Sequence, residues 1–207
     1  MIFQKIKFLI FLLLCGLSCF AQDQHKLAVY NIRAMGMNIG TITVQEKIEG
    51  ENLFVEATSD VEVCLIFKIR AKYMQSSRYR NGVLQESLLK TYKRGKLNST
   101  TRLAINDNGY IMDKDGKISQ INDVINYSGS SLWFHEPKEG ASMYFEISGE
   151  KAIVKLISPH KYSIKHPNNG NKNEYTFKKG ILKNALIKHS LANVYLSLQE
   201  VTESVPN

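Results

Sequence analysis

This sequence contains few cysteines, which excludes a fold held together by disulfides. Three are present among 207 residues, and two of them, Cys15 and Cys19, lie in an N-terminal segment that we expect to be removed. Cys64 then remains alone, so the mature chain forms no intramolecular disulfide. Cys64 stands beside Ile66 on one face of an alternating apolar segment, which predicts a small packed residue rather than a nucleophile.

The patterns of common catalytic and metal sites are also missing. The five histidines form no close pair with another metal-ligand residue at zinc spacing, and the serines at 128–131 lie in no Gly-x-Ser-x-Gly elbow. His135 and Glu136 are adjacent, as a base and its orienting acid would be, but neighbours in an extended segment point to opposite sides. The sequence therefore predicts no catalytic residue, no metal and no cofactor.

One short segment resembles the middle of a calcium-binding loop. Residues 113–116 read Asp-Lys-Asp-Gly, with carboxylates where the third and fifth loop positions would be. The first position would then be Ile111 and the twelfth Asn122, so two required carboxylate ligands are absent. We interpret this segment as a hairpin turn.

The first 21 residues have the pattern of a secretory signal peptide. Two lysines precede a short apolar core, and small residues stand at Cys19 and Ala21. We predict cleavage after Ala21, which leaves residues 22–207 as a single β-rich domain without a transmembrane segment, in the periplasm or secreted. The alternative is a lipoprotein acylated at Cys19, but Gly16 takes the place of the usual large aliphatic residue and argues against it.

The charge balance is moderately basic. There are 27 Lys and Arg against 19 Asp and Glu, a net charge of +8, and loss of Lys5 and Lys7 with the signal peptide leaves +6. Most basic residues alternate with apolar ones, as on the solvated face of a sheet. An anionic partner, such as lipid head groups or a polysaccharide, is the alternative. Nucleic acid is not an expected partner, because exported proteins rarely meet it.

From residue 27 onward, apolar residues mostly alternate with polar ones, and turn residues interrupt the pattern at short intervals. The Asn81-Gly82 dipeptide favours a type I′ turn. The pattern predicts strands over residues 27–35, 39–48, 53–57, 61–73, 76–80, 83–92, 97–105, 110–112, 142–148, 151–158, 162–166, 174–177, 181–189 and 194–200.

Residues 118–136 are the longest segment without a strand pattern. Apolar residues at Ile121, Val124 and Ile125 have partly helical spacing, and Ser119 is placed to cap a first turn. We predict one short helix here, loosened or ended by the serines at 128–131, that leads into an aromatic anchor.

So many antiparallel strands must avoid exposing long open edges. One short helix cannot cover both faces of a large open sheet, but it can cover one. We predict an all-β, mainly antiparallel fold in which a curved sheet, a barrel or half-barrel, is capped or covered on one face by the helix. A sandwich with the helix as a connector is the alternative.

Aromatic residues occur along nearly every strand, and most should pack in the core. If the sheet encloses a cavity, the same residues line a pocket for an acyl chain or a similar ligand. The residues predicted to contact such a ligand are Tyr73, Tyr110, Tyr127, Trp133 and Phe134.

Several short motifs are present along the mature chain. They are an Asn-Gly hairpin at 81–82, an I-x-Y-S motif at 125–128, an L-W-F-x-E-P motif at 132–137, and then Tyr162, Ile164, Pro167, Asn173, Tyr175 and Gly180. Together they resemble a family of exported bacterial proteins known as domain of unknown function 6134. The resemblance implies a secreted or periplasmic β-rich protein of Bacteroidetes type without an established activity, in which Glu136 and Pro137 are structural.

Three functions are therefore weighed. The first is an exported cell-envelope protein that binds an apolar or amphipathic, lipid-like ligand without catalysis. The second is a structural or partner-binding envelope protein that uses its sheet face or an edge strand. The third is a glycan or lipid hydrolase, which requires paired carboxylates facing one cleft.

Overall fold

The computed structural model of the chain describes residues 23–64, 68–190 and 192–204. The predicted signal peptide and the side chain of Cys64 lie outside the described residues. Within the described part, fourteen antiparallel strands form one sheet and one short 3-10 helix, η1, stands between β8 and β9. The elements are β1 (Gln24–Ala34), β2 (Met37–Glu49), β3 (Asn52–Cys64), β4 (Lys68–Arg80), β5 (Val83–Lys93), β6 (Lys96–Asn106), β7 (Gly109–Lys114), β8 (Lys117–Ile121), η1 (Gly129–Trp133), β9 (Ser142–Phe145), β10 (Glu150–Ser158), β11 (Lys161–Lys165), β12 (Lys172–Lys178), β13 (Ile181–Ile187) and β14 (Val194–Ser204).

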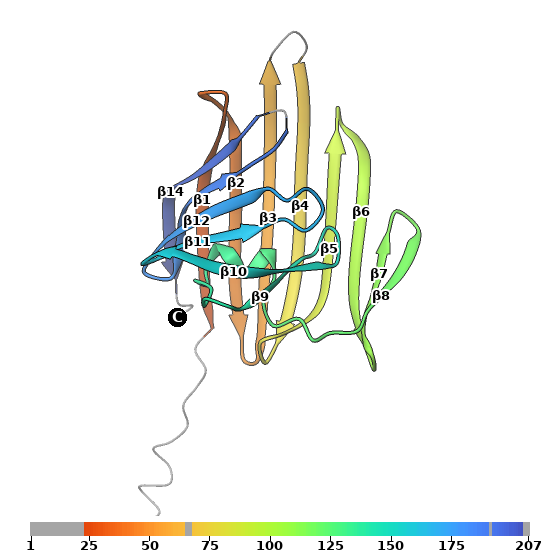
Figure 1. Cartoon of the computed structure of the whole chain (residues 1–207). Coiled ribbons are helices and arrows are strands. Elements are labelled where there is room, and N and C mark those ends of the chain that lie inside the picture. The colour runs from red at the N-terminus through yellow and green to blue at the C-terminus, as the bar shows by residue number, and fades with distance from the viewer. Residues whose placement is uncertain (1–22, 65–67, 191, 205–207) are drawn as a thin grey trace, which may run out of the picture.

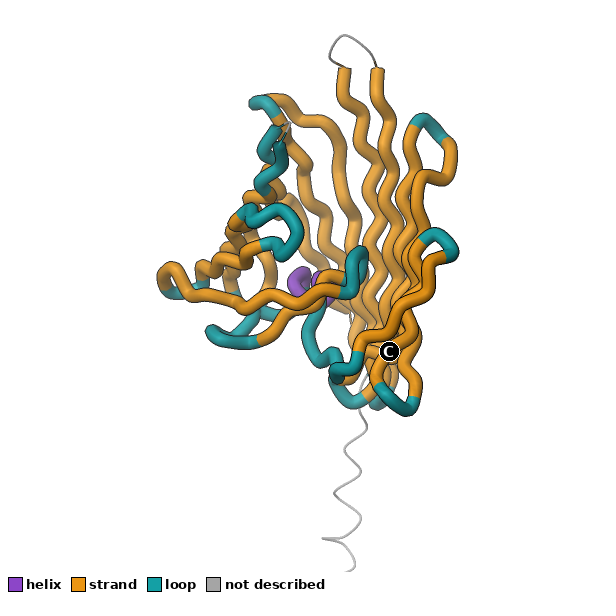
Figure 2. Tube along the Cα trace, turned by 45° about the vertical axis from the view of Figure 1, so that its right-hand side comes forward, coloured by secondary structure: helices purple, strands orange, loops and turns teal. Residues whose placement is uncertain are grey.

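The sheet consists of two meanders joined at the middle. Strands β1 to β8 pair in sequence order, strands β9 to β14 do the same, and β14 pairs with β1 to join them. Figure 1 shows β9 to β13 running across the front of the long upright strands. Figure 2 shows η1 between these two layers. The predicted all-β curved sheet is therefore confirmed. Among the described residues, no helix is long and apolar enough to span a bilayer.

The sheet is curled but does not close by strand pairing, because β8 and β9 remain separate edges. The segment after β8 fills this seam instead. The backbone N–H of Tyr144 donates to the carbonyl of Tyr127 (3.0 Å), and the N–H of Leu84 donates to that of Ile125 (2.8 Å). On the outside, Lys151 pairs with Asp123 at 2.8 Å. The loop after β8 is thus bonded to β9, β5 and β10, and these contacts stand where a ladder between β8 and β9 is absent.

Two apolar clusters form the core, and β9 lies between them. Met143 belongs to the larger cluster with Leu132 and Phe134, whereas Tyr144 belongs to the smaller cluster with Tyr110. Successive residues of a strand point to opposite faces. The strand β9 is therefore buried on both sides, and its two faces hold the two halves of the fold together.

The prediction of one long strand over residues 61–73 is wrong. This stretch contains the end of β3 and the start of β4, which pair Val61 with Ala71 and Ser59 with Tyr73. Opposed residues of paired strands share a face, and both members of each pair have odd numbers. The period-2 pattern therefore continues across the hairpin as it would along an unbroken strand.

The helix within residues 118–136 is much shorter than predicted. Ser119 lies in strand β8 rather than at a helix start, and η1 begins only after Ser128. The serines expected to end the helix instead begin it, since the N–H of Ser128 donates to Oγ of Ser131 (3.3 Å). The apolar spacing that suggested a helix comes from Ile121 at a strand end and from Ile125, which is buried in the smaller cluster.

The short hairpins follow the predicted turn chemistry. Asn81 and Gly82 have φ angles of 50° and 75°, and Asp115 and Gly116 have 52° and 82°. Positive φ at both central residues is the mark of a type I′ turn. The interpretation of residues 113–116 as a hairpin turn is thus confirmed.

Candidate functional site

A cavity of about 350 Å³ lies on the concave side of the sheet, and its lining comes from both layers and from η1. Most of its walls are apolar. The polar groups on the lining are few and lie mainly on β4 and just after β9. The lining residues are Ile42, Ser59, Tyr73, Gln75, Leu89, Gly129, Leu132, Trp133, Met143, Phe145, Glu146, Ile147, Tyr175, Leu182, Ile187 and Leu196.

The structure brings two of the five predicted ligand residues, Tyr73 and Trp133, to this cavity. The other three do not line it. Tyr110 lies in the smaller core cluster, where its hydroxyl donates to the carbonyl of Leu84 (2.7 Å). Phe134 is buried in the larger cluster, and the hydroxyl of Tyr127 donates to the carbonyl of His135 (2.6 Å). Phe134 and Tyr127 thus pack in the cluster that also contains several lining residues, whereas Tyr110 lies in the other cluster.

A buried carboxylate, Glu146, marks the polar end of the cavity. Its Oε1 accepts from Nε2 of Gln75 (2.9 Å), from the N–H of Ser130 (2.9 Å) and from Oγ of Ser128, and its Oε2 accepts from the N–H of Gly129 (2.9 Å). Among the described residues no lysine, arginine or histidine pairs with it. The negative charge is therefore held by neutral donors alone, two of them at the first turn of η1.

Gly129 favours this arrangement. A Cβ atom at that position would stand 2.8 Å from Oε2 of Glu146, closer than side-chain carbons approach other atoms. The absence of a side chain lets the carboxylate reach the backbone N–H directly. In the Ser-Gly-Ser-Ser sequence at 128–131, Ser128 and Gly129 donate to Glu146, whereas the hydroxyls of Ser130 and Ser131 contact that of Tyr79.

A row of polar side chains on the inner face of β4 continues from this carboxylate. The hydroxyl of Tyr73 donates to Oε1 of Gln75 (2.6 Å), and Oγ of Ser77 is 3.0 Å from that of Ser87. The hydroxyl of Tyr79 contacts Oγ of Ser130 at 2.7 Å. Burial raises the pKa of the Tyr73 and Tyr79 hydroxyls, and the charge of Glu146 raises them further.

Sequence reasoning missed this row, although a signal for it was present. Tyr73, Gln75, Ser77 and Tyr79 follow one another at every second position, so one face of β4 carries polar atoms at each step. That face is the buried one. A strand with polar residues on both faces indicates a polar network inside the fold.

Trp133, the only tryptophan, packs its ring against Tyr30 with centroids 5.2 Å apart. Its Nε1 is buried and has no hydrogen-bond partner among the described residues. Because the indole lines the cavity, its emission reports directly on whatever enters.

His135 and Glu136 point to different partners, as expected for adjacent residues in an extended segment. Nε2 of His135 lies 2.6 Å from Oε2 of Glu46, and Lys26 pairs with the other oxygen at 3.2 Å. Burial acts to raise the pKa of Glu46, but the hydrogen bonds and charges of His135 and Lys26 outweigh it and leave the pKa below its ordinary value. Glu136 accepts from the hydroxyl of Tyr162 (2.8 Å), which ties this segment to β11.

Carboxylates that form a catalytic pair are not brought together in the cavity. Glu146 is the single acidic side chain among the described residues that line it. Among the described residues, no group of three or more His, Cys, Asp or Glu side chains is arranged to hold a metal ion.

Comparison with solved structures places the fold among barrel-like sheets. The crystal structure of a β-barrel-like protein of domain of unknown function DUF1849 from Brucella abortus is similar, with a TM-score of 0.55 and 8% identity, over 90% of this chain and 98% of that one. A DUF1089 family protein from Pseudomonas aeruginosa gives a TM-score of 0.44 and 10% identity, over 70% of this chain and 88% of that one. At such identity, the DUF1849 likeness concerns the fold alone.

No curated protein matches the sequence. A family model described as Domain of unknown function (DUF6134) matches residues 30–199. This range includes η1, Glu146 with its hydrogen-bond donors, and the residues that line the cavity. As the sequence motifs predicted, the chain belongs to the DUF6134 family.

Proposed function

We propose that this protein is exported to the cell envelope and binds an apolar or amphipathic, lipid-like ligand in the cavity beneath Trp133. The observation that carries the proposal is the lining itself, which is apolar over most of its area and has a polar end formed by Tyr73, Gln75 and Glu146. A mostly apolar cavity with a few placed polar groups is the usual form of a small-molecule site.

The polar end favours some head groups over others. Glu146 places a negative charge in surroundings of low dielectric constant, so an anionic head group beside it is repelled. An uncharged hydroxyl avoids that cost and has the acceptors of Gln75 and Glu146 within the same region. We therefore expect long-chain alcohols to bind better than fatty acids of the same length.

Trp133 fluorescence tests the binding. Each buried methylene contributes about 0.8 kcal/mol, so affinity for n-alkyl alcohols should rise about fourfold per carbon until the cavity is full. Ile187→Phe, which fills part of the cavity, should weaken binding. Leu156→Phe, an exposed position on β10 outside the lining, is the matched control.

Two results would reject the proposal. One is Trp133 emission that does not change along the alcohol series. The other is binding that ignores chain length and is equal in the Ile187 and Leu156 variants. Native mass spectrometry of protein from its own envelope should show a bound ligand that organic solvent extracts.

Export is tested at the mature N-terminus. The expected mass corresponds to a chain that begins at Gln22. A mass that includes a diacylated Cys19 would replace the soluble assignment with a lipoprotein.

A second candidate, binding of an envelope protein partner, is favoured by the β8 edge. In the described part of the chain, this edge strand pairs with β7 alone, and Ile118 and Ile111 are exposed on β8 and β7. Such an edge accepts an added strand. Affinity capture from the envelope should then yield a stoichiometric partner that Ile118→Lys releases, whereas Ile153→Lys, at an exposed apolar position on β10, retains it.

A further inference from the structure

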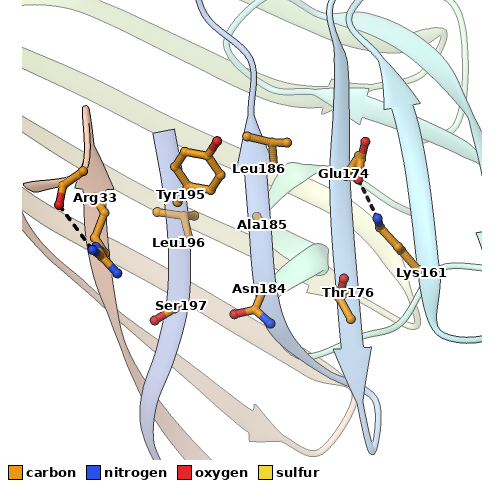
Figure 3. Close-up of a pocket in the computed structure, with 11 residues that line it drawn as sticks. Arg33, Lys161, Glu174, Thr176, Asn184, Ala185, Leu186, Tyr195, Leu196 and Ser197 are labelled. Carbon is orange, nitrogen blue, oxygen red and sulfur yellow. Dashed lines mark hydrogen bonds and ion pairs between the residues drawn. The ribbon is translucent and has the colours of Figure 1, made fainter. Parts of the chain in front are cut away.

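A second concavity of about 500 Å³ lies on the opposite, outer face of the sheet and crosses β1, β14, β13, β12 and β11 (Figure 3). It arises where two strands separate. Strands β13 and β14 pair only from Asn184 with Ser197 to Ile187 with Val194. Beyond those residues β14 continues along β1 and β13 continues along β12. Figure 3 shows the two ribbons diverging below Asn184 and Ser197.

Strand register aligns the outward side chains of this groove. Arg33 pairs with Tyr195, Tyr195 with Leu186, and Leu186 with Glu174, which makes one row across four strands. Asn184 belongs to the next row, two residues along the strands. With strands about 4.8 Å apart and about 6.6 Å between rows, the polar groups around Tyr195 cover an area about 10 Å by 7 Å.

The side chains in the groove have unused binding capacity. Tyr195 is 48% exposed, an unusual position for a large aromatic side chain, and Figure 3 shows its ring between β14 and β13. Within the described residues, the Tyr195 hydroxyl, the Asn184 amide and the Thr176 hydroxyl make no hydrogen bond. Core packing and internal hydrogen bonding therefore explain none of the three.

Charge in the groove is positive on balance. Lys161 and Glu174 form an ion pair at 2.7 Å and offset each other. Arg33 donates one bond to the carbonyl of Gly36 (3.2 Å), and no carboxylate pairs with it among the described residues. Most of its five N–H donors remain free for a ligand.

We propose that this groove is a saccharide-binding site for one or two sugar rings, with a preference for a carboxylate-bearing sugar. The ring of Tyr195 offers an apolar face for the C–H side of a pyranose. Asn184, Thr176 and Glu174 offer donors and acceptors for its hydroxyls, and Arg33 offers a bidentate partner for a carboxylate. The site stands independently of the inner cavity, which opens on the other face of the sheet.

Titration calorimetry with glucuronic acid, glucose and cellobiose tests the proposal, because the first two differ only in the carboxylate. We expect saturable binding, with glucuronic acid favoured over glucose by up to about fivefold, as for an exposed charge pair. That preference should disappear in Arg33→Gln and at high salt. Tyr195→Ala should weaken binding about tenfold, whereas Tyr195→Phe should retain it. Val201→Ala, at an exposed position on β14 outside the groove, is the matched control.

Absence of saturable binding of all three sugars at millimolar concentration would overturn the proposal. Equal binding by Tyr195→Ala and the parent protein would also overturn it, because the sugar would then bind elsewhere. Binding of long-chain alcohols in the inner cavity should be unchanged in Tyr195→Ala. That measurement separates a failure of this site from a failure of the proposed function or from misfolding.

Discussion

Substitution of Glu146 by Gln tests the central feature of the cavity, a carboxylate held by donors alone. Two physical terms oppose each other at this position. Only 4% of Glu146 is exposed, so burial of its charge costs free energy that an uncharged amide would not. Against this, the amide replaces one acceptor oxygen with an NH₂ donor. Either Oε1, with its three donors, or Oε2, with the N–H of Gly129, would then face a donor.

The hydrogen bonds decide the sign of the effect. Placing the amide oxygen at the Oε1 position preserves three bonds in weaker, neutral form and loses the bond from Gly129. A hydrogen bond to a charged group contributes about 1.5–3 kcal/mol, and a buried donor without a partner costs about 1–3 kcal/mol. The gain from removing the buried charge offsets part of these losses. We therefore expect Glu146→Gln to lower the free energy of unfolding by about 3 kcal/mol. For a chain of this length, the loss corresponds to a decrease in Tm of about 6–12 °C.

Urea unfolding followed by circular dichroism measures the change. Glu86→Gln is the control, because Glu86 pairs with Arg78 on the solvent-exposed face. Its substitution should change the free energy of unfolding by about 0.5 kcal/mol or less. A Glu146→Gln variant equal to or more stable than the parent would refute the reasoning. It would mean that the cost of burying the charge exceeds the value of the bonds that hold it.

Three further predictions concern the same core. Gly129→Ala should destabilise the fold by about 2 kcal/mol in the same urea assay, because the new Cβ displaces Glu146 from its N–H donors. Glu46 has a pKa below its ordinary value of 4.5, so its contribution to stability is present above pH 4.5 and is lost as the pH falls through the lowered pKa. In Glu46→Gln the acid limb of a stability–pH profile should be flatter. Burial raises the pKa of Tyr175 from 10.0 to about 12. The contribution of the neutral Tyr175 hydroxyl to stability is therefore complete below pH 10 and is lost as the pH rises toward 12. Alkaline absorbance titration of Tyr175→Phe should lack one late-titrating hydroxyl.

Local chemistry in the sequence was sufficient for most of the sheet. A hairpin was predicted wherever a glycine or asparagine allowed positive φ at the turn, as at Asn81-Gly82. The β3–β4 hairpin was missed because the sequence between Cys64 and Lys68 is Leu-Ile-Phe, which contains no turn residue. Alternation fixes the face of a side chain, but it does not distinguish a long strand from two paired strands of matching parity.

The candidate site was less accessible to sequence reasoning, since its polar end is made by distant residues. Gln75 and Glu146 are 71 positions apart, and neither stands out in the sequence without knowledge that β4 faces the turn after β9. Trp133 was predicted as an aromatic anchor because it is the only tryptophan and lies within residues 118–136, the one long segment without strand pattern. Tyr110, by contrast, belongs to a second cluster whose existence follows only from how the sheet curls.

The open seam and the buried carboxylate together explain how a cavity can persist in this fold. A closed barrel holds its interior open through a continuous ladder of backbone hydrogen bonds, but β8 and β9 do not pair. Here Glu146 joins the first turn of η1 to Gln75 on β4, so Leu132 and Trp133 are held at a fixed distance from the opposite wall. Loss of these bonds would allow η1 to move toward the sheet and fill the space. Weaker binding of long-chain alcohols and lower stability should therefore occur together in Glu146→Gln, whereas Glu86→Gln, at an exposed ion pair on β5, should change neither appreciably.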